Sequence, residues 1–121
     1  MIFIGDIELG YSKLGGLGVF AKKDIKNGAL IEQGIMTVLT NVDGHENPML
    51  FTWSDDRTKW AIGTGYLHFY NHDNLQYTNI KKVGDLKNNK LYVYATKNIR
   101  KGDELKSVYF SKEWRKCFSN F

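Results

Sequence analysis

The segment Phe69-Tyr70-Asn71-His72-Asp73 is the most informative stretch of this sequence. It sets an amide beside an imidazole after two aromatic residues, and these groups can hydrogen-bond an amino-acid moiety or an adenine edge. Taken alone, the pair Asn71-His72 is more typical of an asparagine in a structural turn followed by a histidine whose ring nitrogens are hydrogen-bonded within the protein. Two other segments accompany it: Leu14-Gly15-Gly16-Leu17-Gly18-Val19-Phe20, and Arg100-Lys101-Gly102-Asp103-Glu104-Leu105 followed by Tyr109.

The glycine-rich segment has two interpretations. Glycine permits positive φ and close approach of the backbone to a ligand, so residues 15–18 can line a cofactor, although a tight β-turn is the commoner use. The chain contains no GxxxxGK[ST] phosphate loop, and the segment lacks the GxGxxG spacing of a dinucleotide fold. Tyr109 likewise is either a phenol at a reacting centre or one more buried tyrosine in a chain with seven.

The composition is that of an ordinary soluble globular protein, with 42% hydrophobic and 25% charged residues. At 121 residues, we expect one domain spanning residues 1–121. The single cysteine, Cys117, excludes an intrachain disulfide and a Cys-rich zinc site. No metal site is predicted, because the spacing of His68 and His72 lacks the acidic residue of an H-E-x-x-H motif.

The net charge of +4 comes from lysines and arginines spread along the chain. This charge favours anionic partners slightly, but solubility explains it equally well. The N-terminal residues 1–6 lack the basic leader and long apolar run of a signal peptide. No stretch approaches the ~20 apolar residues of a membrane-spanning helix. We therefore expect a soluble intracellular protein with no membrane partner.

Frequent glycines divide the chain into short segments, which favours a mostly β fold. In one segment, Leu91, Val93 and Ala95 alternate with polar or aromatic residues, as in a strand with one buried face. The strands predicted in this way cover residues 2–9, 19–21, 29–39, 50–53 and 60–62, and a hairpin of 77–83 with 90–96.

The C-terminal residues have a different period. Phe110, Trp114 and Phe118 recur at i, i+4 and i+8, and Ser111 can cap a helix. This pattern predicts a short amphipathic helix over residues 112–118. Core packing is the commonest role of such an aromatic stripe.

Together and in this order, the three segments resemble the SET-domain protein lysine methyltransferases. Gly16-Leu17-Gly18-Val19-Phe20 is similar to the family's G-x-G-V-F motif, and Gly65-Tyr66-Leu67-His68-Phe69-Tyr70-Asn71-His72 resembles its G-Y-G-S-L-F-N-H motif. Asn98 to Leu105 resembles the strand and turn before the last motif, and Tyr109 stands where the family has its catalytic tyrosine. The similarity runs from about Lys13 to Trp114. The short length most resembles the minimal single-domain viral and bacterial members.

The resemblance implies a mostly β fold, the SET-domain β-clip. This consists of small curled sheets with a C-terminal pseudoknot, and we expect the short C-terminal helix after it. In the pseudoknot, the C-terminal segment threads under a preceding loop. Threading would bring Asn71 and His72 close to Tyr109 despite their separation in the sequence.

The resemblance also implies a cofactor, S-adenosyl-L-methionine, and a protein substrate that bears a lysine; a histone-like protein is the family-level candidate for this substrate. Tyr109 would be the catalytic residue, and Tyr66 and Tyr70 would form the wall of the substrate channel. An apolar aromatic channel helps a lysine, whose pKa in water is about 10.4, to lose its proton before it attacks. The cofactor-binding residues implied are Gly16, Leu17, Gly18, Asn71 and His72, with Phe110 or Trp114 stacked on adenine.

Several positions depart from the family pattern, and they concern substrate specificity more than cofactor affinity. These are Met49 for an aromatic residue, Leu67 for a glycine, Asp73 for a serine, Gln76-Tyr77 for Pro-Asn, and Phe110 for a glycine. Two alternatives to an enzyme therefore stay open. One is a non-catalytic SET-like interaction domain. The other is a small basic β module that binds nucleic acid through lysines and aromatic rings, which leaves the three motifs and their order unexplained. Minimal members of the family can be homodimers, but no heptad seam argues for one here.

Overall fold

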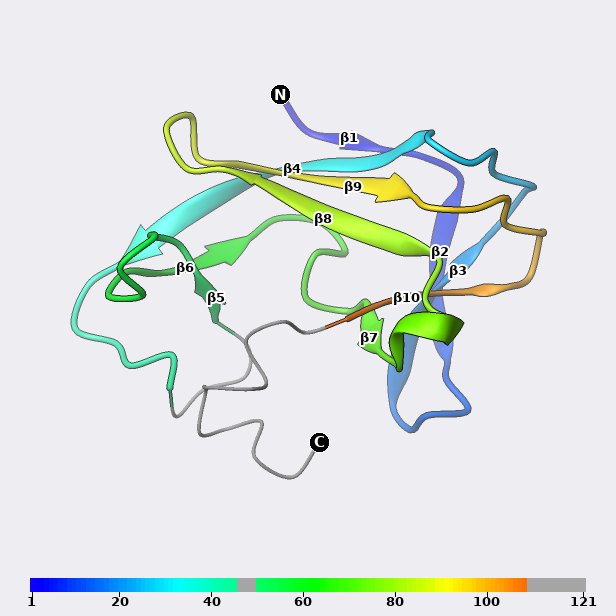
Figure 1. Cartoon of the computed structure of the whole chain (residues 1–121), viewed down its shortest axis with the longest axis horizontal. Helices are drawn as coiled ribbons and strands as arrows, with labels where there is room; N and C mark the ends of the chain where they lie inside the picture. Colours follow the sequence, from blue (N-terminus) through cyan, green and yellow to red (C-terminus); the bar gives the residue numbers. More distant parts are fainter. Residues whose placement is uncertain (46–49, 109–121) are drawn as a thin grey trace.

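The computed structural model describes residues 1–45 and 50–108 of the chain (Figure 1). Nearly all of its regular structure is β. The elements, in chain order, are β1 (Phe3–Ile4), β2 (Ile7–Tyr11), β3 (Leu17–Ala21), β4 (Leu30–Leu39), β5 (Phe51–Thr52), β6 (Trp60–Gly63), β7 (Asn71–His72), the 3-10 helix η1 (Leu75–Tyr77), β8 (Ile80–Asp85), β9 (Lys90–Ala95) and β10 (Glu104–Ser107).

The larger of the two sheets in the described residues is built on the long strand β4. Its order is β5-β6-β4-β9-β8, and β1 also pairs with β4. The first half of β4, residues 30–35, pairs with β9, whereas residues 36–39 pair with β6. One strand thus serves two sets of neighbours, and it bends between them across the upper part of Figure 1. This change of partner curls the sheet.

The smaller sheet has the order β2-β3-β10-β7 and lies beside the first (Figure 1). In it β10 is antiparallel to β3 but parallel to β7, with Lys106 opposite Asn71 and Ser107 opposite His72. A parallel pair needs a long crossover connection, here the whole of residues 73–103. The last strand, β10, therefore lies between β3, from the N-terminal part of the chain, and β7.

The hydrophobic core fills the space where the inner faces of the two sheets meet. Val19 and Leu105 contribute from the smaller sheet, and Ile31 and Val93 from the larger. All four side chains are at most 2% exposed. Tyr70, which immediately precedes β7, belongs to the same core and is 1% exposed.

The structure confirms the predicted mostly β class of curled sheets. The hairpin of β8 with β9 is formed, with Leu91, Val93 and Ala95 buried as the alternation predicts. The strand predicted over residues 2–9 is instead two strands, because Gly5 donates its N–H to Ile31 O and the chain then leaves β4 for the smaller sheet. The helix predicted over residues 112–118, and the part of the pseudoknot that follows β10, lie outside the described residues.

Candidate functional site

Asn71 joins two segments that lie far apart in the sequence. Its side-chain Nδ2 donates to Leu17 O at 3.0 Å and to Glu104 Oε2 at 2.8 Å. Both neighbours can only accept, which fixes the amide with its nitrogen toward them. The Oδ1 of Asn71 accepts no hydrogen bond from any residue that the structure describes. It is therefore an acceptor open to a ligand.

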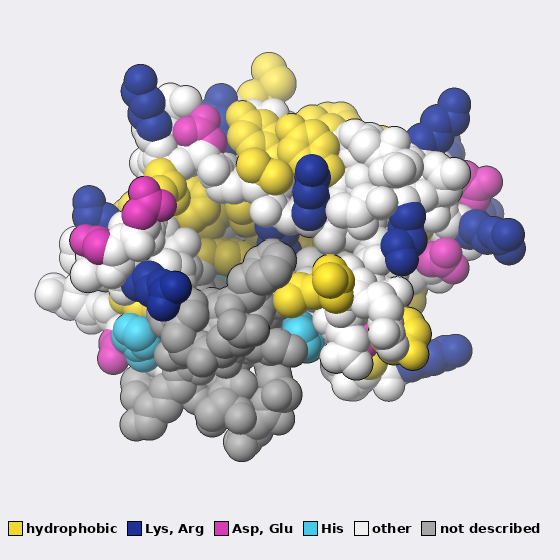
Figure 2. Space-filling view, viewed as in Figure 1, with side chains coloured by type: hydrophobic (Ala, Val, Ile, Leu, Met, Phe, Trp, Pro, Cys, Tyr) yellow, Lys and Arg dark blue, Asp and Glu magenta, His cyan; other side chains and the backbone are white. Residues whose placement is uncertain are grey.

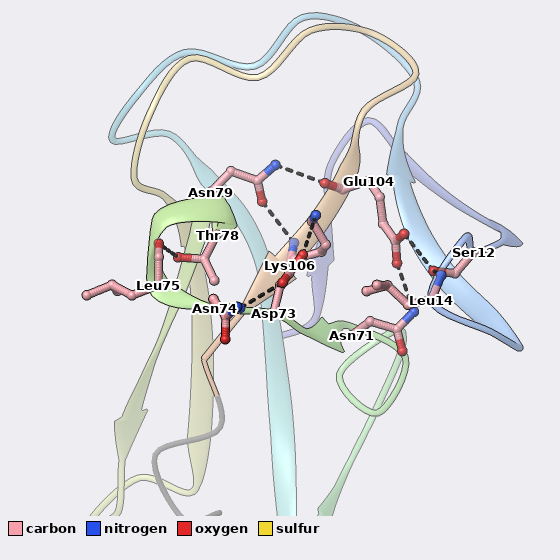
Figure 3. A network of polar contacts seen from close by, with 10 residues as sticks. All are labelled: Ser12, Leu14, Asn71, Asp73, Asn74, Leu75, Thr78, Asn79, Glu104 and Lys106. Carbon is pink, nitrogen blue, oxygen red and sulfur yellow. Dashed lines mark hydrogen bonds and ion pairs between the residues drawn. The ribbon is translucent and has the colours of Figure 1, made fainter. Parts of the chain in front are cut away.

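Glu104 holds the glycine-rich loop in place (Figure 3). Besides Asn71, its carboxylate accepts a hydrogen bond of 2.7 Å from Ser12 Oγ, and that hydroxyl in turn accepts from Leu14 N at 3.0 Å. Ser12 N donates to Gly16 O at 2.9 Å and closes the loop. One half-buried carboxylate thus ties β10, β7 and the loop before β3 together.

The three glycines of this loop serve different purposes. Gly15 and Gly16 have φ values of +104° and +66°, and a Cβ on either would face open space. Gly18 is different, because a Cβ there would stand 2.9 Å from Asn71 Nδ2 and closer still to Glu104 Oε2. The first two glycines are required by the backbone, and Gly18 by the side chains that pack on it.

A second set of contacts binds β10 to the segment between β7 and β8 (Figure 3). The amide of Asn79 donates to Glu104 O at 2.9 Å and accepts from Lys106 N at 2.8 Å, as a strand would. Lys106 Nζ forms an ion pair of 2.7 Å with Asp73 Oδ2. The hydrogen bond from Lys106 lowers the pKa of the Asp73 carboxyl. The acidic residue after Asn71-His72 therefore anchors the neighbouring strand.

Tyr66 and Tyr70, the predicted channel residues, both bind the buried carboxylate of Glu32. Tyr70 donates its hydroxyl to Glu32 Oε1 at 2.7 Å, and the Tyr66 backbone N–H donates to Oε2 at 2.9 Å. Glu32 is 0% exposed. Burial raises its pKa, although these two hydrogen bonds act in the opposite direction. Burial, with the charge of Glu32, also raises the pKa of the Tyr70 hydroxyl.

A lysine also lies near the Tyr70 ring. Lys82 Nζ is 5.6 Å from the centroid of that ring and 5.2 Å from the centroid of the Phe51 ring. Burial lowers the pKa of Lys82 to about 8, and the charge of Glu32 only partly offsets this effect. The predicted channel residue Tyr70 thus contacts both a buried carboxylate and a desolvated amine.

The structure brings part of the predicted site together. Leu17, Gly18 and Asn71 are in contact, Gly16 lies in the adjoining loop, and His72 follows on β7, half-buried opposite Ser107. The predicted residues Tyr109, Phe110 and Trp114 lie outside the described residues. Sequence reasoning missed the polar residues that organise the site, which are Ser12, Glu32, Asn79, Lys82, Glu104 and Lys106.

Two of these omissions had a signal in the sequence. Glu32 is the only charged residue in the apolar stretch 29–39, and a lone carboxylate in a predicted strand indicates a buried polar contact. Glu104 lies in the segment from Asn98 to Leu105, which resembles a family motif. That resemblance indicated a turn and a strand there and did not indicate that the Glu104 carboxylate accepts hydrogen bonds. In residues 1–45 and 50–108, no cluster of three or more His, Cys, Asp or Glu side chains suits a metal ion. Those residues also form no helix with the length and apolarity needed to cross a membrane.

The fold and site define a small domain of curled β sheets. In it the glycine-rich loop before β3 lies next to β7, which carries Asn71 and His72, and to β10, the last described strand. The family model of the SET domain matches residues 16–110. The chain therefore belongs to the SET-domain family. No curated protein matches the chain by sequence.

Several solved structures have the same fold. A Plasmodium falciparum protein, provisionally named a histone methyltransferase, is 29% identical, with a TM-score of 0.70 over 88% of this chain and 95% of that one. A humanized mutant of Chaetomium thermophilum Polycomb Repressive Complex 2 bound to the inhibitor GSK126 is 23% identical, with a TM-score of 0.71. The match covers 90% of this chain but 15% of that one, and at this identity it supports the fold alone. A third structure, of the Chaetomium thermophilum complex itself, is 21% identical, with a TM-score of 0.69 over 88% of this chain and 15% of that one.

Proposed function

We propose that this chain is a protein lysine methyltransferase that uses S-adenosyl-L-methionine as methyl donor. The family supports methyl transfer in general, and one observation supports this site in particular. Asn71 hydrogen-bonds the Leu17 carbonyl and the Glu104 carboxylate, and so holds the Asn-His strand against the glycine-rich loop. These are the two segments to which the resemblance assigns the donor.

The residues present suit such a donor. S-adenosyl-L-methionine supplies a methyl group on a cationic sulfonium and carries an ammonium group that needs acceptors. The open Oδ1 of Asn71 offers one, and the nearby Glu104 carboxylate gives the site negative potential. Gly15 and Gly16 leave open space beside the loop backbone, so a ligand can approach it closely. His72 would complete the pocket, and Phe110 or Trp114 would stack on the adenine.

The acceptor lysine would enter between Tyr66 and Tyr70, with Tyr109 orienting its amine. An aromatic wall disfavours the ammonium form and so favours the neutral nucleophile. Glu32 keeps Tyr70 in one position, because its Oε1 accepts a hydrogen bond of 2.7 Å from the buried Tyr70 hydroxyl. Correct orientation of the amine toward the methyl group removes much of the entropic barrier to transfer. A histone-type tail is the first substrate to test, since a relative at 29% identity bears a histone methyltransferase name.

The donor site is tested by calorimetry with S-adenosyl-L-methionine. We expect the wild-type protein to bind and Asn71→Ala to lose at least tenfold in affinity, equivalent to about 1.4 kcal/mol. Asn88→Ala is the matched control, because it removes the same amide from an exposed turn, where the partner of Asn88 among the described residues is Asp85. Equal affinities for Asn71→Ala and the wild type would contradict the proposed site.

The reaction is tested by transfer of an isotopically labelled methyl group to a lysine-bearing histone peptide. We expect Tyr109→Phe to abolish turnover while S-adenosyl-L-methionine still binds. Donor binding without transfer to any protein lysine would indicate the non-catalytic interaction domain. A steeply salt-dependent affinity for single-stranded nucleic acid, without donor binding, would indicate the basic β module.

A further inference from the structure

Two adjacent lysines on β8 lie on opposite faces of the larger sheet. Lys81 is opposite Tyr94 on β9, and Lys82 is opposite Val93. Directly opposed residues of an antiparallel pair have their side chains on the same face. Val93 is 0% exposed, so Lys82 is directed toward the core and Lys81 away from it. Figure 2 shows the outer aspect of β8 and β9, where hydrophobic side chains gather and basic side chains project beside them.

The amine of Lys82 lies in surroundings that suit a reacting lysine. The rings of Phe51 and Tyr70 are both within 6 Å of Nζ, the range of cation–π attraction. Tyr70 is a wall residue of the channel proposed above. Its hydroxyl is bound to Glu32, so the ring cannot turn away from the amine without breaking a buried hydrogen bond.

Lys82 also lines a pocket of about 300 Å³ that reaches the end of β10. Other lining residues are Thr78, Ser107 and Val108, and the neighbouring Lys81 borders the same pocket. The hydroxyl of Ser107 is buried and has no hydrogen-bond partner among the described residues. A pocket with an unpartnered polar group is equipped to receive a ligand or a reacting group.

We propose that Lys82 is itself a methyl acceptor of this domain, so that the protein methylates its own β8 strand from within. The inference rests on the proposed function, because the methyl group comes from the same sulfonium donor. It goes beyond that function because it names an acceptor within the chain. The lysine would reach the reacting centre from the side of the pocket without binding of a second protein.

The chemistry is that of an ordinary amine alkylation. The neutral Nζ lone pair forms a bond to the methyl carbon, the carbon–sulfur bond breaks, and its electron pair stays on sulfur as a thioether. The proton that goes to water is the one that the Lys82 ammonium loses before the attack, and the product of the transfer is a methylated ammonium. A pKa near 8 leaves roughly half of Lys82 neutral at pH 8, whereas an unperturbed lysine with a pKa of about 10.4 is almost fully protonated there. The methylated ammonium remains a cation, and cation–π attraction to the Phe51 and Tyr70 rings still stabilises it.

The experiment is peptide mapping by mass spectrometry of the full chain, before and after incubation with S-adenosyl-L-methionine. We expect methyl groups to accumulate on Lys82 and not on Lys81. The fraction methylated per unit time should not change when the protein is diluted tenfold, because the acceptor and the site belong to one molecule. The rate should rise with pH up to about 8 and then level off, as the amine of Lys82 becomes neutral.

Two variants provide the matched comparison. Lys82→Arg keeps the cation between the rings but removes the acceptor, and Lys81→Arg makes the same change on the outer face, where Nζ is 6.0 Å from the Tyr94 ring. Only Lys82→Arg should abolish self-methylation. Mapping of the wild-type chain needs no variant and therefore decides the point even if Lys82→Arg fails to fold.

Several outcomes would overturn the inference, and they are distinguishable from a failure of the proposed function. Methylation of exposed lysines with Lys82 unmodified would show transfer between molecules in solution. Methylation of an added lysine peptide with Lys82 unmodified would support the proposed function but would refute the inference that Lys82 is a methyl acceptor. Absence of donor binding in calorimetry would remove both.

Discussion

Substitution of Gly18 by alanine is the sharpest test of the site's geometry. The new Cβ would stand 2.9 Å from Asn71 Nδ2 and even closer to Glu104 Oε2, so the carboxylate has to move. Gly18 does not have a positive φ, so the added methyl creates no backbone strain. The effect should come almost entirely from the two displaced side chains.

The magnitude follows from the hydrogen bonds that the displaced carboxylate would lose. Glu104 accepts from Ser12 Oγ at 2.7 Å and from Asn71 Nδ2 at 2.8 Å. Hydrogen bonds to a charged group contribute roughly 1.5–3 kcal/mol each, and partial exposure of Glu104 reduces this to about 1–2 kcal/mol each. We therefore expect Gly18→Ala to lower the free energy of unfolding by about 2–4 kcal/mol. At a typical slope this is a fall of roughly 1–2 M in the urea midpoint.

The assay is urea unfolding of four proteins in a double-mutant cycle: the wild type, Gly18→Ala, Glu104→Ala and the double variant. If the methyl group acts by displacing the carboxylate, Gly18→Ala should cost little in the Glu104→Ala background. Gly84→Ala is a matched control on β8, where a Cβ meets only the Trp53 ring at 3.3 Å and longer. Donor affinity should fall with Gly18→Ala and not with the control.

Additive costs in this cycle would refute the reasoning. They would mean that the methyl group at position 18 and the carboxylate at position 104 affect stability independently. A Gly18→Ala variant as stable as the wild type would refute it as well, because the site would then have room for the Cβ.

Three further predictions concern the buried and half-buried charges. Tyr70→Phe leaves the Glu32 carboxylate with one donor fewer, and urea unfolding at pH 7 should show a loss of about 1–3 kcal/mol; an unchanged midpoint would contradict the role of the 2.7 Å hydrogen bond. The raised pKa of Glu32 means that the folded state holds this proton more tightly, so stability falls as pH rises from about 4.3 through the folded pKa. The free energy of unfolding of Glu32→Gln should not fall in this pH range. If its difference from the wild-type value were the same at every pH, the raised pKa of Glu32 would be refuted. Asp73→Asn removes the ion pair with Lys106. The side chains of Asp73 and Lys106 are 19% and 22% exposed, so the free energy of unfolding should fall by about 0.5–1 kcal/mol at pH 7. Because the pKa of Asp73 is lowered, this contribution is full above about pH 3.9 and is lost as pH falls through the folded pKa, so the two unfolding curves should converge in acid.

The local pattern of the sequence predicted those elements whose burial repeats with a regular period. The alternation in residues 90–96 gave β9 and its buried face, and the apolar run of residues 29–39 gave β4. The bend that separates β1 from β2 was not predicted, because it depends on the hydrogen bond from Gly5 to Ile31 O. No short-range pattern contains a contact of that kind.

The candidate site was predicted only where family motifs exist. Motif similarity placed Leu17 and Asn71 in one site, and the structure brings them to 3.0 Å. The motifs did not indicate that Glu104 holds both segments, since its partners are 33 and 92 residues away in the sequence. Nor did they indicate Lys82, which looks like one half of an ordinary basic pair until the register of β8 shows which face it occupies.

The parallel pairing of β7 with β10 has a consequence for how the protein is made. Within the described residues, β7 pairs with β10 alone, and β10 is the last strand of the smaller sheet to leave the ribosome. Until it emerges, Asn71 lacks the Glu104 carboxylate and Asp73 lacks its lysine. Contacts between residues so distant in sequence close slowly, because the loop entropy must be overcome first. A nascent chain can therefore form the β8–β9 hairpin early, but it acquires its binding site only in the final steps of folding.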